Sequence, residues 1–121
     1  MIERGSVVIL NLANPTEKFW GVLSELTQVG VTFSGLRIEG FEDWMAQAAS
    51  KDAENTGTIG LSTIFVPLFR VERMFLDERV GEVESYRERF ERRVGVPLGV
   101  YLGMEGSQVG DPSDENSSDG A

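Results

Sequence analysis

Apolar and polar side chains alternate along residues 18–41, and this period of two is typical of β-strands. Near the start of the stretch, Trp20 and Val22 share one face, while Phe19 and Leu23 share the other. Both faces are therefore apolar. The pattern predicts two long, bent strands joined at Val29-Gly30.

Glycines divide this stretch at the places where a strand would have to bend or turn. Gly21 lies inside the first of the two strands, where a glycine usually marks a bend or a close backbone approach. Gln28-Val29-Gly30 separates the two strands and predicts a turn. In the second strand the apolar set changes phase at Ser34-Gly35, so we expect a β-bulge or a barrel corner there.

Three further apolar runs predict the remaining strands. One precedes the central pair and two follow it, and they cover residues 6–13, 62–67 and 71–77. Pro67 ends the fourth strand because proline cannot donate a hydrogen bond to a ladder. Residues 68–70 are then left for a tight single turn before the fifth strand.

Helical periodicity appears in two segments. Residues 41–49 carry apolar side chains at helical spacing and acidic residues in the first turn, which predicts a short helix between the third and fourth strands. Residues 81–94 predict a longer C-terminal helix, with Glu88 and Arg92 spaced to form an ion pair. Residues 98–102 are expected to add a short strand or an extended segment.

Length and composition indicate one folded domain over residues 1–103. Residues 104–121 hold five of the twenty acidic residues and no Lys or Arg, so they predict a disordered acidic tail. Residues 50–60 contain little core material and predict a mobile loop. The net charge is −9 overall and only −4 over residues 1–103, which does not favour nucleic-acid binding driven by phosphate contacts.

The sequence contains neither Cys nor His. This removes the commonest general base, thiolate nucleophiles and the commonest transition-metal ligands, so we expect a protein that is not an enzyme and that uses no metal or cofactor. The first residues lack the pattern of a signal peptide, and no window is apolar over the length of a membrane span. We therefore expect a cytoplasmic protein that does not enter a membrane.

One family shares this order of strands. Residues 7–12 form an apolar strand, Asn14-Pro15 a polar turn, and Trp20-Gly21-Val22-Leu23 a glycine followed by apolar residues. Over residues 7–77 this arrangement resembles the Sm-like small β-barrel family, with residues 40–61 as the variable insertion between the third and fourth strands. The resemblance implies a strongly bent, mainly β, five-stranded antiparallel barrel, and it implies an RNA-binding ring as one functional alternative.

The candidate contact residues are aromatic or basic. Phe19 and Trp20 lie on opposite faces of one strand, so one of them points outward, either to a partner or to a covering helix. Trp44 on the short helix poses the same choice between core and interface. The basic candidates lie near the fifth strand and on the C-terminal helix, where glutamates interleave with them: Arg70, Arg73, Arg89 and Arg93.

Several strands are apolar on both faces, and a single small barrel has only one interior. We therefore expect a homo-oligomer formed through strand edges or faces. The functional hypothesis is a self-associating interaction or scaffold module with a protein partner. An Sm-like RNA-binding ring is the first alternative, and a small-molecule-binding or enzyme-accessory barrel is the second.

Overall fold

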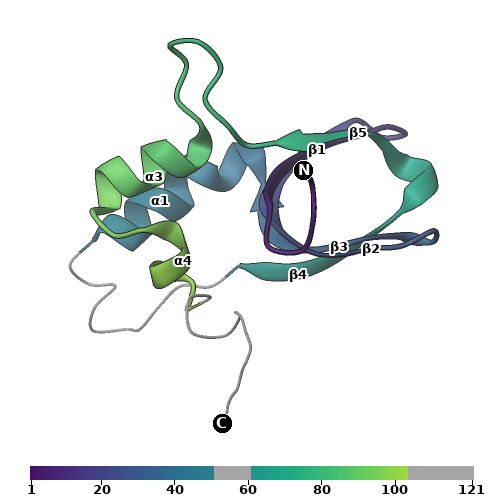
Figure 1. Cartoon of the computed structure of the whole chain (residues 1–121), viewed down its shortest axis with the longest axis horizontal. Coiled ribbons are helices and arrows are strands. Elements are labelled where there is room, and N and C mark those ends of the chain that lie inside the picture. Colours follow the sequence, from purple (N-terminus) through teal and green to yellow (C-terminus); the bar gives the residue numbers. More distant parts are fainter. Residues whose placement is uncertain (51–60, 104–121) are drawn as a thin grey trace, which may run out of the picture.

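The computed structural model describes residues 1–50 and 61–103, and Figure 1 shows their arrangement. Five strands form one antiparallel sheet in the order β4-β3-β2-β1-β5. The strands are β1 (Val7–Leu12), β2 (Glu17–Leu26), β3 (Gly30–Arg37), β4 (Ser62–Pro67) and β5 (Val71–Leu76). The expected mainly β fold with five antiparallel strands is confirmed. The closed barrel is not, because the sheet ends at two edge strands, β4 and β5.

Within residues 1–50 and 61–103, helices occupy the two predicted places and one more. Between β3 and β4 lie a 3₁₀ turn, η1, and a helix, α1, and a second 3₁₀ turn, η2, joins β4 to β5. The bounds are η1 (Ile38–Gly40), α1 (Phe41–Ala49), η2 (Leu68–Arg70), α3 (Tyr86–Val94) and α4 (Leu98–Tyr101). The prediction for residues 98–102 was wrong, since residues 98–101 form a single helical turn. The predicted segments 51–60 and 104–121 lie outside the described residues.

The sheet is curled, and Figure 1 shows β1 and β5 lying opposite β3 and β4. Apolar side chains fill the inside of the curve, and we call this group the inner core. Its buried members come from four strands: Val8, Leu10, Leu12, Leu23, Val31, Phe33 and Val66. Burial of this apolar area is the main favourable term for the sheet.

Helices lie against part of the other face of the sheet, at β1 and β2, and bury a second group, the helix-side core (Figure 1). Its members come from β1 and β2 and from three helices: Val7, Ile9, Trp20, Val22, Phe41, Trp44, Met45, Ala48, Phe90 and Leu98. The alternation of β1 and β2 thus sends one set of side chains to each core. Apolar character on both faces of these two strands is explained by the covering helices.

The close approach of β2 and β3 depends on a cross-strand pair of glycines. Gly21 lies opposite Gly35 in the register. A Cβ atom on Gly21 would lie 2.5 Å from the carbonyl oxygen of Ser34, and one on Gly35 would lie 2.3 Å from that of Trp20. Any larger residue at either position would force the strands apart, so these glycines permit the curvature.

The expected phase change at Ser34-Gly35 is not a bulge in β3. The register shift lies on the β2 side, between Leu23 and Glu25. Phe33 belongs to the inner core, whereas Leu36 packs against the helix-side core. The two apolar sets of β3 therefore face two different cores rather than one core through a slipped register.

Candidate functional site

The two edges of the sheet differ in the side chains that they carry. β5 contains Glu72 and Arg73, both exposed, and its pairing with β1 has a register shift beside Asn11. Charges and irregularities of this kind protect an edge from pairing with another chain. β4 reads Ser-Thr-Ile-Phe-Val-Pro, has no charged residue, and pairs with β3 without a register shift. Of the two edges, β4 therefore has neither the charges nor the register shift of β5, and Pro67, its last residue, is the only one of its residues without a backbone N–H.

Exposed apolar side chains lie at one end of β4, and we call Val29, Phe65, Leu68 and Phe69 the end patch. Phe65 is 53% exposed, Val29 71% and Phe69 88%. The Leu68 N–H donates to the Val29 carbonyl over 2.9 Å, and the Phe65 ring lies against Gly30. The patch therefore joins η2 and β4 to the β2–β3 turn. Sequence reasoning missed it because apolar residues in turns belong to no periodic stripe.

Arg70 holds η2 to the β1–β2 turn. Its Nε donates to the Ala13 carbonyl over 3.1 Å, and its Nη2 donates to the Pro15 carbonyl and to Glu17 Oε1. Hydrogen bonds from Arg70 and then Arg37 hold the pKa of Glu17 below its ordinary value. The end patch is thus carried on a turn that is fixed by backbone and side-chain contacts at both hairpin tips. Arg70 was a candidate contact residue, and the structure gives its guanidinium this internal role.

The aromatic candidates lie in the cores. Trp20 is fully buried in the helix-side core and Trp44 is 7% exposed. Phe19 points the other way and packs against the inner core, with its ring 5.7 Å from that of Phe33. The outward-facing member of the Phe19-Trp20 pair therefore lies under helices, and neither tryptophan is part of an exposed surface.

Of the three remaining basic candidates for a contact surface, one has partners within the protein and two do not. Arg89 forms an ion pair with Glu42 and stacks over the rings of Phe41 and Tyr86. Arg73 and Arg93 are exposed, and neither has an ion-pair or hydrogen-bond partner among the described residues. They lie on β5 and on α3, so the structure does not combine the four arginines into one surface.

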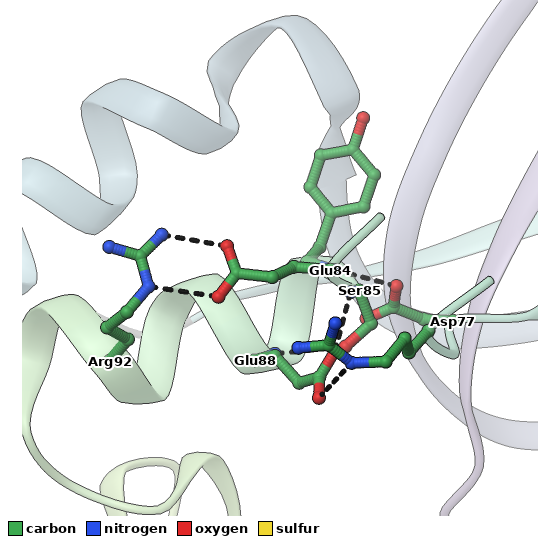
Figure 2. A network of polar contacts seen from close by, with 7 residues as sticks. Asp77, Glu84, Ser85, Glu88 and Arg92 are labelled. Atoms are coloured by element: carbon green, nitrogen blue, oxygen red, sulfur yellow. Dashed lines mark hydrogen bonds and ion pairs between the residues drawn. The ribbon is translucent and has the colours of Figure 1, made fainter. Parts of the chain in front are cut away.

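A polar network surrounds the start of α3, as Figure 2 shows. Ser85 and Glu88 form a capping box, in which each side chain accepts a hydrogen bond from the other's backbone N–H. Asp77 accepts the backbone N–H groups of Tyr86 and Arg87, each over 2.8 Å. The first three N–H groups of α3 are therefore satisfied, and the helix begins at Tyr86 rather than at Gly81 as expected.

The ion pairs of this network shift the titration of their members. Arg92 donates two hydrogen bonds to Glu84, which lowers the pKa of Glu84 and raises the pKa of Arg92 (Figure 2). The Ser85 backbone N–H, followed by Arg79, lowers the pKa of Glu88. The expected Glu88–Arg92 pair is absent from the described ion pairs: Arg92 binds Glu84 and Glu88 binds Arg79. The carboxylates of Glu84 and Glu88 are therefore both engaged in contacts that stabilise helix α3.

The described residues offer no assembled centre for metal chemistry. No group of three or more acidic side chains in residues 1–50 and 61–103 is placed to hold a metal ion. In the same residues, no helix has both the length and the apolar character required to cross a bilayer. The features that remain for function are the β4 edge, the end patch and the unpaired cations. Comparison with family models, with curated proteins and with solved structures finds no match for this chain.

Proposed function

We propose that this protein is a non-enzymatic, self-associating interaction module, and that the β4 edge pairs with a second copy of the chain. The observation that carries the proposal is the uncharged, regular edge of β4 with the exposed Phe65 on it. An open strand edge presents unpaired N–H and C=O groups, and natural proteins either protect such an edge or pair it. β4 lacks the protective charges that β5 has.

The exposed apolar surface supports the same proposal. Helices account for the apolar outer faces of β1 and β2, but Phe65 on β4 and Phe75 on β5 stay exposed beside the two edges. The end patch extends this surface past the end of β4. A second copy that pairs with β4 would remove Phe65 and the nearest part of the end patch from water, which adds an apolar contribution to the edge hydrogen bonds.

Two geometries are consistent with an open β4 edge. Pairing of β4 with β4 of a second copy gives a two-fold dimer, whereas pairing with β5 uses two different surfaces and gives a ring when the rotation between copies closes. The ring is the more specific version of the proposal, because it also assumes an Sm-like assembly. It draws on the five-stranded antiparallel sheet, which is compatible with a small β-barrel fold.

The test is absolute mass from light scattering after size exclusion, at two protein concentrations and two salt concentrations. We compare the wild-type chain with Phe65→Lys, which places a charge beside the β4 edge. The matched control is Val83→Lys, which makes the same kind of change at an exposed apolar residue in the segment before α3. We expect an oligomer for the wild type and the control, and a monomer for Phe65→Lys. A monomeric wild type at the higher concentration would overturn the proposal.

RNA binding by such a ring is the second candidate function. The observation in its favour is that Arg73 and Arg93 are exposed and without partners among the described residues. Bound RNA would raise the absorbance at 260 nm of the purified protein and would be removed by high salt. An absorbance spectrum typical of protein alone at low salt, together with an oligomeric mass, would exclude the RNA-binding ring and support the interaction module.

A further inference from the structure

Three polar side chains form one row across the outer face of the sheet. Asn11 on β1 lies opposite Lys18 on β2 and opposite Arg73 on β5. Ile9, two residues before Asn11 on the same strand, belongs to the helix-side core, so Asn11 points to that outer face. Residues directly opposite each other across strands point to the same face. The row therefore places two cations on either side of one amide.

The row stands out because its members have no partners. Ten of the eleven Lys and Arg residues are described, and seven of them donate to an oxygen atom of the protein: Arg4, Arg37, Arg70, Arg79, Arg87, Arg89 and Arg92. Within the described residues only Lys18, Arg73 and Arg93 have none. Two of these three unpaired cations lie in the same cross-strand row.

Asn11 adds a donor between the two cations. Its Oδ1 is buried and lacks a hydrogen-bond partner, and among the described side chains it is the only buried polar atom in that state. Its Nδ2 is not buried in this way and also donates to no described residue, so the amide N–H groups are accessible. No described hydrogen bond fixes the rotation of the amide, so its NH₂ group is free to turn toward the surface as a donor.

We propose that Lys18, Asn11 and Arg73 form a binding site for a small oxyanion of the phosphate class. Neighbouring strands are about 4.8 Å apart, so the Cα atoms of Lys18 and Arg73 are separated by about 10 Å. Both side chains are long enough for their charged groups to meet above Asn11. An ammonium, a guanidinium and the NH₂ group of an amide all donate hydrogen bonds, which matches the several acceptor oxygens of a phosphate.

The surrounding charges favour a small anion over a polymer. The two nearest carboxylates in the sequence are Glu17 and Glu72. Glu17 is neutralised by ion pairs with Arg37 and Arg70, whereas Glu72, next to Arg73, is exposed and would repel a long polyanion. Binding of a nucleic-acid chain requires cations along several successive phosphates. The one other unpaired cation of the described residues, Arg93, lies on α3, and residues 1–103 carry a net charge of −4. The site therefore fits one anionic group.

The test is a titration of the full chain with inorganic phosphate, followed through backbone amide NMR shifts, with sodium chloride at equal ionic strength as the salt control. We expect saturable shifts around residues 11, 18 and 73. Lys18→Gln and Arg73→Gln should each weaken binding by about fivefold, as expected for the loss of one exposed charge. Asn11→Asp should abolish binding, because it replaces the donor by a negative charge. Arg93→Gln, which removes an unpaired arginine elsewhere, should bind like the wild type.

Three results would overturn the proposal. The first is a set of shifts that chloride reproduces, and the second is a set of shifts that Lys18→Gln and Arg73→Gln leave unchanged. The third comes from a parallel titration with a single-stranded uridine decamer. If the decamer binds more than about 100-fold tighter than phosphate and Arg93→Gln weakens it, the surface is a nucleic-acid surface and not a small-anion site. A decamer no tighter than phosphate supports the small-anion site.

Discussion

The indole Nε1 of Trp20 donates a hydrogen bond to Asp77 Oδ2 over 3.0 Å, and this contact links the buried centre of the sheet to the start of a helix. Trp20 is fully buried, so its N–H needs a partner inside the protein. Asp77 follows the last residue of β5 and also accepts two backbone N–H groups of α3. One carboxylate thus joins β2, β5 and α3.

We predict that Asp77→Ala lowers the free energy of unfolding by about 2–4 kcal/mol. The substitution leaves the buried Trp20 N–H unpaired, at a cost of about 1–3 kcal/mol, and removes acceptors from the helix start, at a cost of about 1 kcal/mol. Urea denaturation followed by tryptophan emission measures the change. The neighbouring Glu78→Ala removes an exposed carboxylate and should stay within about 0.5 kcal/mol of the wild type. Equal effects for the two variants would contradict the assigned role of Asp77.

The glycine pair of β2 and β3 gives a second prediction. Gly21→Ala and Gly35→Ala should each destabilise the fold by about 1–3 kcal/mol, the usual range for overpacking, because the added methyl group meets backbone atoms at 2.5 and 2.3 Å. Gly40→Ala is the matched control. Its Cβ would meet only Leu36 Cδ1 at 3.5 Å, and the φ of Gly40 is −91°, which alanine adopts without strain. Thermal unfolding distinguishes them, and an equal loss at all three positions would contradict the close-approach argument.

Sequence patterns predicted the elements well where one face of the element meets one core. The short helix was predicted at residues 41–49 and α1 has these bounds, because Phe41, Trp44, Met45 and Ala48 all pack into the helix-side core. The predicted strands 62–67 and 71–77 likewise correspond to β4 and to β5, which ends at Leu76. The periodicity of apolar residues alone was sufficient to place these three elements.

The start of α3 and the roles of the aromatic residues could not be predicted from the periodicity of apolar residues. The apolar spacing included Val83, which is exposed, whereas the helix begins after Ser85. The Ser85–Glu88 spacing is a capping-box signal that could have placed this start. Alternation also showed that Phe19 and Trp20 lie on opposite faces, but which face the helices cover depends on how the whole chain is arranged. The end patch depends on contacts between two turns, which no local pattern encodes.

A third prediction concerns pH. Arginine partners or backbone N–H groups lower the pKa values of Glu17, Glu84 and Glu88 from their ordinary value of 4.5. When the folded pKa lies below the unfolded one, the stabilisation is complete above the unfolded pKa and is lost as the pH falls through the folded pKa. Stability should therefore be constant between pH 6 and pH 8, where no His titrates, and should decrease below about pH 5.

Denaturation midpoints in urea at several pH values measure this dependence. Glu84→Gln removes one of the three carboxylates and should reduce the loss between neutral and acidic pH. Glu78→Gln, at an exposed carboxylate without a described partner, is the control and should keep the wild-type pH profile. A profile for Glu84→Gln that matches the wild type would contradict a role for the Glu84–Arg92 pair in acid sensitivity.

The last prediction concerns the attachment of η2, which carries half of the end patch. Arg70→Gln removes the donors to Ala13, Pro15 and Glu17, and we expect a loss of about 1–2 kcal/mol, since the pair is partly exposed. The Ala13 N–H donates to the Arg70 carbonyl over 2.9 Å, so its hydrogen exchange reports whether η2 stays in place. We expect faster exchange of this amide in Arg70→Gln and unchanged exchange in Arg73→Gln, whose side chain has no described partner. If the amide stays protected in Arg70→Gln, backbone contacts alone hold η2, and the end patch does not depend on the Arg70–Glu17 contact.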